Sequence, residues 1–142
     1  MTICADSSFL VSNYIQDVHS PEAIRRMSTL PSVWITPLNK TELAHALQQY
    51  VFRKQLSAFE AQRAWSEFQQ DCASGIWIPI GLPEKIWETS ISLAQKHGPT
   101  LGVRTLDSVH VACALELNAR KFWTFDDRQG RLAEAVGLDT SA

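Results

Sequence analysis

The chain lacks long apolar runs, paired cysteines and an excess of either charge. No stretch of about 18 consecutive apolar residues occurs among its 142 residues, so we expect no membrane-spanning helix. The three cysteines (Cys4, Cys72 and Cys113) form no Cys-x-x-Cys pair. This excludes a disulfide scaffold and a zinc ribbon, and it favours reduced thiols in a cytoplasmic protein. The N-terminus has no basic segment followed by an apolar one, so we expect no signal peptide.

Two common catalytic motifs are also missing from the chain. It has neither a Gly-rich phosphate loop of the GxxxxGK[ST] type nor a nucleophile elbow with a Ser-His-Asp order. Any hydrolytic activity would therefore depend on an activated water, without a covalent intermediate. The 13 basic and 15 acidic residues give a formal net charge of −2, which excludes a strongly basic coat protein for nucleic acids.

What the sequence does contain is an alternation of short strands with longer helices. Runs of β-branched and aromatic residues predict strands at 2–5, 33–36, 76–80 and 122–125. Apolar spacing and capping signals predict helices at 20–30, 38–53, 57–73, 83–97, 105–118 and 127–136. No linker or repeat interrupts this pattern, so we expect one domain over residues 1–142. The predicted fold class is α/β, with three layers and a mainly parallel sheet of four to five strands.

Several residues refine this prediction locally. Pro79 indicates that the third strand lies at an edge of the sheet or is already leaving it, because proline cannot donate to the strand ladder. Ser20, which precedes a proline, is predicted to cap the first of these helices. Gly98 and Pro99 are predicted to end the helix that begins near Pro83. The helix at 105–118 is apolar on nearly all sides, so we expect it to be buried.

Four acidic residues fall where strands give way to helices. Asp6 and Asp126 directly follow predicted strands, and Glu42 and Asp107 fall in the first turns of predicted helices. Sites in parallel sheets form at the carboxyl ends of the strands, so we expect these four side chains to gather at one edge. Carboxylates that lie close together raise each other's pKa unless a cation compensates their charge. One or two Mg²⁺ or Mn²⁺ ions would do so, and could bind a phosphodiester and activate a water.

Each of these acids also has a simpler interpretation. An acidic side chain near a helix N-terminus is usually a cap stabilised by the helix dipole, and an Asp after a strand is often only a turn residue. Their joint placement favours the functional interpretation. For His110, one turn after Asp107, a buried structural role is favoured over a part in the site. Arg104 could contact a substrate phosphate or lie on the solvated surface, and both alternatives stay open.

The acids lie in segments that together resemble PIN-domain nucleases, and specifically the small VapC-type toxins of bacterial toxin–antitoxin pairs. The segments are ADSSFLV (5–11), TELAHAL (41–47), RTLDSVHVACAL (104–115) and FWTFDDRQGRLAEAVGL (122–138). Their order and intervals are similar to those of the family over nearly the whole chain. The resemblance implies a catalytic and metal-binding quartet, formed by Asp6, Glu42, Asp107 and Asp126.

The resemblance also implies an activity and its partners. Such a protein would be a Mg²⁺- or Mn²⁺-dependent endoribonuclease that hydrolyses phosphodiester bonds of transfer or ribosomal RNA in the cytoplasm. It would be inhibited by a cognate VapB-like antitoxin and would form a homodimer. Ser8 and Thr124 match hydroxyl positions near the acids, and Arg104 is a further auxiliary candidate. The additional acid, Asp127, would either hold a metal-bound water or simply begin the last helix.

Features that depart from the family pattern leave other interpretations open. The family usually ends in a fifth strand, which must be short or missing here because only five residues follow Gly137. Trp87 and Trp123, where exposed, could anchor the antitoxin or the second protomer. The main rival is a non-catalytic RNA- or protein-binding module with the same fold. A metal-dependent phosphatase is disfavoured, because Asp6 is the only acid directly after the first strand.

Assigning the quartet to a metal site changes the meaning of the net charge. Setting these four of the 15 acids aside leaves 11 acidic against 13 basic residues. The slight acidity of the chain is thus produced by the predicted site itself, where bound cations would reverse it. We therefore expect binding to RNA to be modest and to depend on metal.

Overall fold

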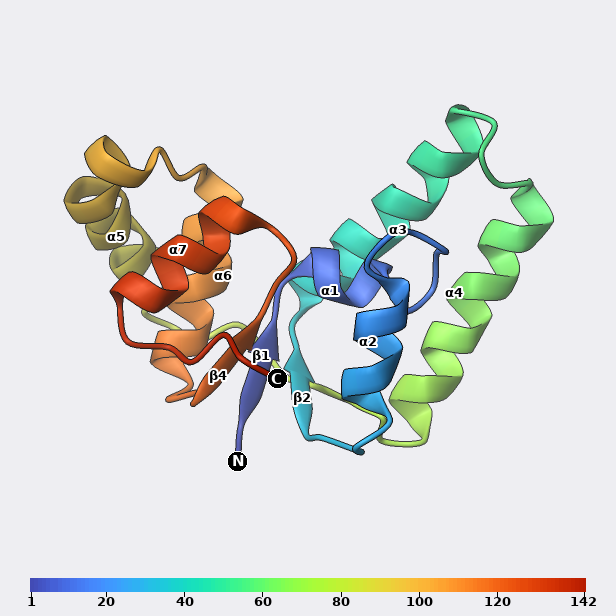
Figure 1. Cartoon of the computed structure of the whole chain (residues 1–142), viewed down its shortest axis with the longest axis horizontal. Coiled ribbons are helices and arrows are strands. Elements are labelled where there is room, and N and C mark those ends of the chain that lie inside the picture. Colours follow the sequence, from blue (N-terminus) through green and yellow to red (C-terminus); the bar gives the residue numbers. More distant parts are fainter.

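The computed structural model describes residues 1–142 and contains four short strands and seven helices (Figure 1). The strands are β1 (Ile3–Ala5), β2 (Val33–Ile35), β3 (Trp77–Pro79) and β4 (Lys121–Trp123). They form a single parallel sheet in the order β3-β2-β1-β4. The predicted α/β class and parallel sheet are confirmed, and Pro79 ends the edge strand β3 as expected.

Helices cover both faces of this sheet. One face carries α1 (Ser7–Val11), α2 (Ser20–Met27), α3 (Pro37–Phe52) and α4 (Ala58–Ala73); the other carries α5 (Ile86–Leu101), α6 (Thr105–Glu116) and α7 (Asp127–Ala135) (Figure 1). Each face has its own apolar cluster, of 15 and of 12 buried residues. Strand β1 serves both clusters, because Ile3 and Ala5 point into the first and Cys4 into the second. No helix is both long and apolar enough to span a bilayer.

Helix α6 is the most deeply buried helix, as its all-round apolar sequence predicts. Eight consecutive residues, from Asp107 to Ala114, are buried, and the helix packs against α5, α7 and β1. Two polar residues of the site, Asp107 and His110, are therefore held on a rigid element close to the sheet. Burial of a helix this apolar provides a large part of the hydrophobic stabilisation on its face of the sheet.

Two local predictions are wrong, and one short helix was missed. Helix α5 continues through Gly98 and Pro99 to Leu101, because a proline in the last turn removes only one helical hydrogen bond and packing on α6 favours the helix. Helix α2 begins at Ser20 itself; its hydroxyl instead donates to the Ile15 carbonyl at 2.8 Å. The short helix α1 was not expected, and Asp6 caps it by accepting from the Phe9 amide.

The C-terminal residues and the tryptophans refine the remaining predictions. A single parallel bridge between Lys121 and Asp139 stands where a fifth strand would be, so that strand is indeed almost missing. Trp123 is only 3% exposed and cannot anchor a partner, whereas Trp87 is 57% exposed on α5. The three cysteines form no disulfide, and Cys4 and Cys113 are buried.

Candidate metal and active site

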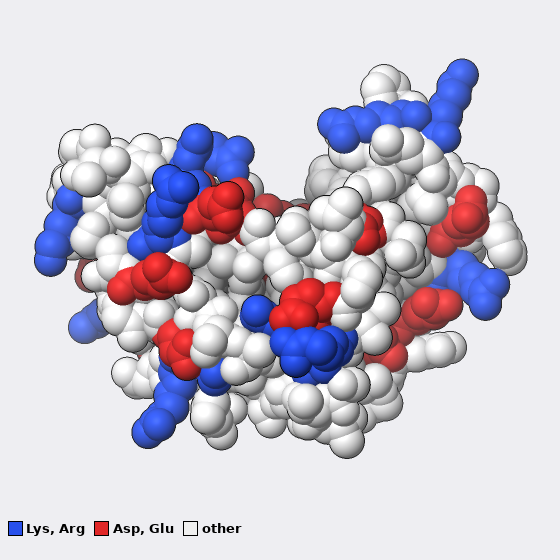
Figure 2. All heavy atoms as spheres, viewed as in Figure 1, with Lys and Arg blue, Asp and Glu red and all other residues white.

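A polar pocket of about 460 Å³ opens at the carboxyl edge of the sheet. All four acids of the predicted quartet line it, and only one of its lining residues, Leu106, is hydrophobic. Figure 2 shows the molecule hollowed at this edge, between the helical layers, with acidic side chains near the hollow and basic ones on its rims. The alternation of strands and helices therefore brings acids from four distant segments to one place.

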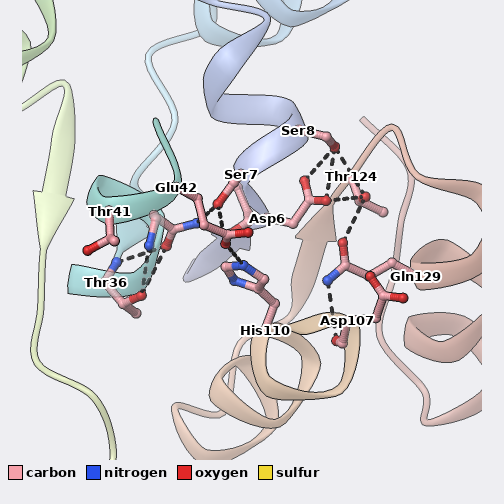
Figure 3. A network of polar contacts seen from close by, with 12 residues as sticks. Asp6, Ser7, Ser8, Thr36, Thr41, Glu42, Asp107, His110, Thr124 and Gln129 are labelled. Carbon is pink, nitrogen blue, oxygen red and sulfur yellow. Dashed lines mark hydrogen bonds and ion pairs between the residues drawn. The ribbon is translucent and has the colours of Figure 1, made fainter. Parts of the chain in front are cut away.

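Asp6 is the most buried of the four acids, with 5% of the residue exposed. Its carboxylate accepts hydrogen bonds from the Ser8 hydroxyl at 2.7 and 2.9 Å and from the Thr124 hydroxyl at 2.8 Å (Figure 3). It also accepts from the Phe9 amide at 3.1 Å. Burial raises the pKa of Asp6 above its ordinary value, although these hydrogen bonds act in the opposite direction. Asp6 is thus fixed in place by neutral groups, without a direct cationic partner.

Glu42 forms a second polar contact, with α1 and α6. The Ser7 hydroxyl donates to Glu42 Oε1 at 2.7 Å, and His110 Nε2 lies 2.5 Å from the same oxygen (Figure 3). Burial raises the pKa of Glu42, but the hydrogen bond and charge of His110, with the Ser7 hydrogen bond, outweigh it and lower the pKa overall. Because both contacts end on Oε1, the other oxygen of this ionised carboxylate has no hydrogen-bond partner.

Arg104 connects the two remaining acids. Its guanidinium lies 3.3 Å from Asp107 Oδ2 and 3.2 Å from Asp126 Oδ2. Asp107 Oδ2 also accepts from the Arg104 amide at 3.0 Å, and Asp126 Oδ1 accepts from the Gln129 amide at 2.9 Å. Both acids therefore act as helix caps, as the simpler interpretation predicted, while they also line the pocket. Asp107 Oδ1, like the second oxygen of Glu42, has no hydrogen-bond partner.

The auxiliary candidates divide into two groups. Ser8 and Thr124 contact Asp6 directly, and Arg104 contacts Asp107 and Asp126. Asp127, by contrast, is exposed as the first residue of α7 and does not line the pocket. Of the two alternatives for Asp127, this placement is that of a residue that begins the last helix.

Sequence reasoning missed three polar residues that position the acids. Ser7 holds Glu42, Asn39 donates its side-chain amide to the Ala5 carbonyl at 3.1 Å, and Gln129 donates to the Asp107 carbonyl at 3.3 Å. Asn39 is 1% and Gln129 2% exposed. Asn39 could have been recognised as the partner of Thr36 in a capping box at the start of α3. No local pattern marks Gln129, which is positioned by tertiary contacts.

The donor set suits a hard divalent cation, although the acids do not form a compact cage. No group of three or more His, Cys, Asp or Glu side chains is arranged to hold a metal ion. The pocket nevertheless offers carboxylate oxygens, two of them without a partner, on Glu42 and Asp107. Mg²⁺ typically binds one or two carboxylates and keeps several waters, so such an open arrangement is compatible with it.

A comparison with protein-family models identifies the fold that carries this pocket. The PIN domain matches over residues 3–135, which include all four acids. The chain belongs to the PIN domain family. The resemblance inferred from the four sequence segments is confirmed at this level, and it covers nearly the whole chain. No curated protein sequence matches the chain significantly.

Solved structures similar to this PIN domain include bacterial proteins at low sequence identity. VapC20 of Mycobacterium tuberculosis, described as a toxin that cleaves the sarcin-ricin loop, superposes with a TM-score of 0.72 at 15% identity, covering 97% of this chain and 98% of that one. FitAcB of Neisseria gonorrhoeae gives 0.72 at 12%, covering 99% and 96%. VapBC2 of Rickettsia felis, bound to a DNA fragment from their promoter, gives 0.72 at 13%, covering 99% and 98%. At these identities the likeness to VapC-type proteins is one of fold.

Proposed function

We propose that this PIN domain is a divalent-metal-dependent endoribonuclease that acts as the toxin of a toxin–antitoxin pair. The observation that carries the proposal is the joint placement of Asp6, Glu42, Asp107 and Asp126 around one polar pocket at the carboxyl edge of the sheet. Acids that served only as helix caps would not need to line the same pocket. Membership of the PIN family and the fold of VapC20 support the same function.

The residues of the pocket would have two roles, to hold the metal and to orient the carboxylates that hold it. Asp6, Glu42, Asp107 and Asp126 would hold Mg²⁺ or Mn²⁺, which when bound supplies the Lewis acidity that activates a water and neutralises charge on the phosphodiester. Ser8 and Thr124 fix the Asp6 carboxylate, and Ser7 with His110 fixes that of Glu42. This leaves the second Glu42 oxygen without a hydrogen-bond partner and available to a ligand. Such partners typically change metal affinity or activity by about 10- to 100-fold.

Arg104 would compensate the negative charge of Asp107 and Asp126 when no metal is bound, and would pair with the substrate when metal is bound. Its side chain is 66% exposed, so it can leave Asp107 and Asp126 without unfolding any element. In the free protein the guanidinium compensates two acids that would otherwise repel each other. If a bound divalent cation supplied that compensation, the guanidinium would be free to pair with an RNA phosphate, as arginine does well.

Two protein contacts belong to the same proposal. A cognate VapB-like antitoxin would cover the acidic pocket, and a second copy of the chain would form a homodimer. Large apolar side chains remain exposed for such contacts, including Phe52 and Phe59 beside the α3–α4 turn and Trp87 and Ile91 on α5. VapBC2, whose structure is bound to a DNA fragment from the promoter, shares the fold of this chain. This likeness supports the proposal of an antitoxin partner.

Cleavage of RNA by the purified chain tests the proposal. We expect structured RNA to be cut in Mg²⁺ or Mn²⁺, cutting to stop in EDTA, and activity to return when the metal is restored. Asp107→Asn should retain the helix cap, since asparagine also accepts a hydrogen bond, but lose cleavage. Cleavage that persists in EDTA, or that is equal in Asp107→Asn and the parent, would refute the catalytic role of the pocket.

Two observations favour the rival, a non-catalytic RNA- or protein-binding module. Arg104 already compensates Asp107 and Asp126, and no three side chains are arranged to hold a metal. Such a module would bind RNA or a protein without cutting it and would bind no divalent cation. Growth arrest that is relieved by co-expression of a small neighbouring gene, together with metal-dependent cleavage, would exclude it.

A further inference from the structure

An aromatic stack connects the acidic pocket to the surface. Phe125 lies between β4 and Asp126, and its ring is parallel to that of His19, with centroids 4.5 Å apart and planes inclined by 5°. On the inner side, the Phe125 ring lies 5.6 Å from that of Phe9, which is fully buried. His19 itself is exposed. We refer to His19 and Phe125 as the stacked pair.

The backbone of the stacked pair is connected through Ser8 to the most buried acid of the site. The Phe125 amide donates to the Ser8 hydroxyl at 3.0 Å, and Ser8 in turn donates to Asp6 at 2.7 Å. Two further pockets, of about 390 and 450 Å³, adjoin the pair, since His19, Phe125 and Asp126 line both of them. Because Asp126 also lines the main pocket, all three pockets meet at this residue.

Several hydrogen bonds order the backbone of the loop that carries His19. The His19 amide donates to Asp17 Oδ1 at 2.8 Å, and the Ser12 hydroxyl donates to Asp17 Oδ2 at 2.8 Å. Ser20 ties the same turn to the Ile15 carbonyl at 2.8 Å. Although His19 occupies the cap position of α2, its side chain makes no capping hydrogen bond. The imidazole therefore has no structural task in the helix, while its backbone is fixed as a preorganised binding group would require.

Charges of both signs lie next to the stacked pair. Arg131 lines one of its two pockets together with Asp126, Asp127 and Glu134. In a further pocket beside Asp126, arginines outnumber acids, because Arg104, Arg128 and Arg131 line it with only Asp126 and Asp127. A flat, exposed ring beside a reactive acidic pocket, flanked by arginines, matches an RNA strand: the base offers a face to stack, and the phosphates offer charge to the arginines. An apolar peptide side chain would leave Arg128 and Arg131, which form no ion pair within the chain, without a partner.

We propose that the stacked pair is the docking surface for one unpaired base of the RNA strand, next to the phosphodiester that is cut. The inference rests on the proposed function. A base in a duplex is not free to stack on a protein side chain, so the substrate must present an unpaired nucleotide close to the cleaved bond. Since every base has a flat face, we expect this contact to select unpaired structure more than sequence.

Fluorescence of a base analogue tests the proposal by binding. Short unpaired RNAs that carry 2-aminopurine at successive positions would be titrated with the full chain in EDTA, so that the strand stays intact, and at chain concentrations high enough to saturate the weaker complex expected without metal. We expect quenching at one position, about tenfold weaker binding and no quenching for His19→Ala, and near-parental behaviour for His19→Tyr, which retains a ring. Val18→Ala is the matched control, because Val18 is 88% exposed in the same loop and outside the stacked pair.

Cleavage of RNAs with single abasic nucleotides provides the second arm. One abasic position should lower kcat/KM about tenfold for the parent, and that penalty should disappear in His19→Ala. Absence of any His19-dependent quenching or abasic penalty, including failure of RNA to bind, would overturn the proposal. So would unchanged RNA affinity in His19→Ala combined with lost binding of a co-expressed antitoxin, because that would assign the pair to a protein contact.

The two proposals fail in distinguishable ways. Asp107→Asn should lose cleavage while it still quenches the base analogue, because Asp107 does not contact the stacked pair. If His19→Ala binds and cleaves like the parent while Asp107→Asn is inactive, the stacking proposal is wrong and the nuclease proposal stands. If Asp107→Asn cleaves like the parent, the nuclease site is wrong whatever His19 does.

Discussion

Asp6 and Asp126 both follow a strand and cap the next helix, yet their surroundings differ. Asp6 is buried and is surrounded by the hydroxyls of Ser8 and Thr124, with no cation in direct contact. Asp126 has a side chain that is 30% exposed and is paired with Arg104. Under the proposed function, the inner acid would be held for a ligand at a cost to the fold, whereas the outer acids, which Arg104 already compensates, would exchange partners.

Replacement of the inner acid should have the largest effect. Asp6→Asn should reduce RNA cleavage by more than the about 10- to 100-fold typical of a supporting contact, because a ligand itself is lost. Asparagine can still accept the Phe9 amide, so we expect the fold to survive. Initial rates in Mn²⁺, with circular dichroism as the folding control, measure this. Equal rates in parent and variant would remove Asp6 from the site.

The same variant should also change how stability depends on pH. Because the pKa of Asp6 is raised by folding, the folded chain holds this proton more tightly than the unfolded chain does. Its contribution to stability is thus present at low pH and is lost as pH rises through the raised pKa. Asp6→Asn should therefore gain in Tm relative to the parent as pH rises from about 4 upward. If the Tm of Asp6→Asn fell relative to that of the parent over that range, the conclusion that burial raises the pKa of Asp6 would be contradicted.

Removal of the Thr124 hydroxyl, a neutral hydrogen-bond partner of Asp6, should have an intermediate effect on the binding of Mn²⁺. Thr124→Val keeps the shape of the side chain but deletes the hydroxyl that donates to Asp6 at 2.8 Å and accepts from the Asp126 amide at 2.9 Å. We expect Mn²⁺ affinity to fall by about 10-fold or more. Thr140→Val is a matched control, since Thr140 contacts Glu134 outside the main pocket. Parental Mn²⁺ affinity in Thr124→Val would show that the hydroxyl does not orient the acid.

Removal of the Arg104 guanidinium should raise the affinity for Mn²⁺, whereas the preceding substitution lowers it. Arg104→Met deletes the guanidinium between Asp107 and Asp126, so Mn²⁺ should bind about 3- to 10-fold more tightly, because no positive charge has to be displaced. RNA cleavage should nevertheless fall, since a phosphate partner is lost. Arg128→Met is the control, because Arg128 lies nearby without an ion pair to either acid. Weaker Mn²⁺ binding in Arg104→Met would mean that Arg104 supports the site and does not compete with the metal.

A change far from both acids should have the smallest effect on the site. Ser57 and Glu60 form a capping box at the start of α4. Ser57→Ala should cost about 1 kcal/mol of unfolding free energy, measured by urea denaturation, and leave Mn²⁺ affinity unchanged. A fall in Mn²⁺ affinity along with stability in Ser57→Ala would mean that the effect of Asp6→Asn comes from lower stability of the fold and not from the loss of a metal ligand.

The sequence was informative wherever a local pattern determines the structure. The alternation of strands with helices fixed the parallel sheet, and the all-round apolar segment at 105–118 located the buried α6. The acids could be placed because each follows a strand or opens a helix. Helix α1 was missed because five residues carry too little periodicity, and the end of α5 because packing on α6 outweighs the signal of Pro99.

The supporting contacts of the site could not be predicted in the same way. Ser7 reaches Glu42 across 35 residues, and Gln129 reaches Asp107 across 22, so no window of sequence contains either pair. The stack of His19 on Phe125 joins two loops that no propensity connects. Such contacts are set by the way the elements pack, and they distinguish a carboxylate that serves only as a cap from one oriented toward a ligand.

Calorimetric titration of Mn²⁺ into the purified chain and into Asp107→Asn tests the central claim most directly. If the acidic pocket is a divalent-cation site, the parent should give a saturable binding isotherm, and the variant should lose it or bind far more weakly while it remains folded. Absence of binding by the parent, or equal binding by the two proteins, would contradict the account.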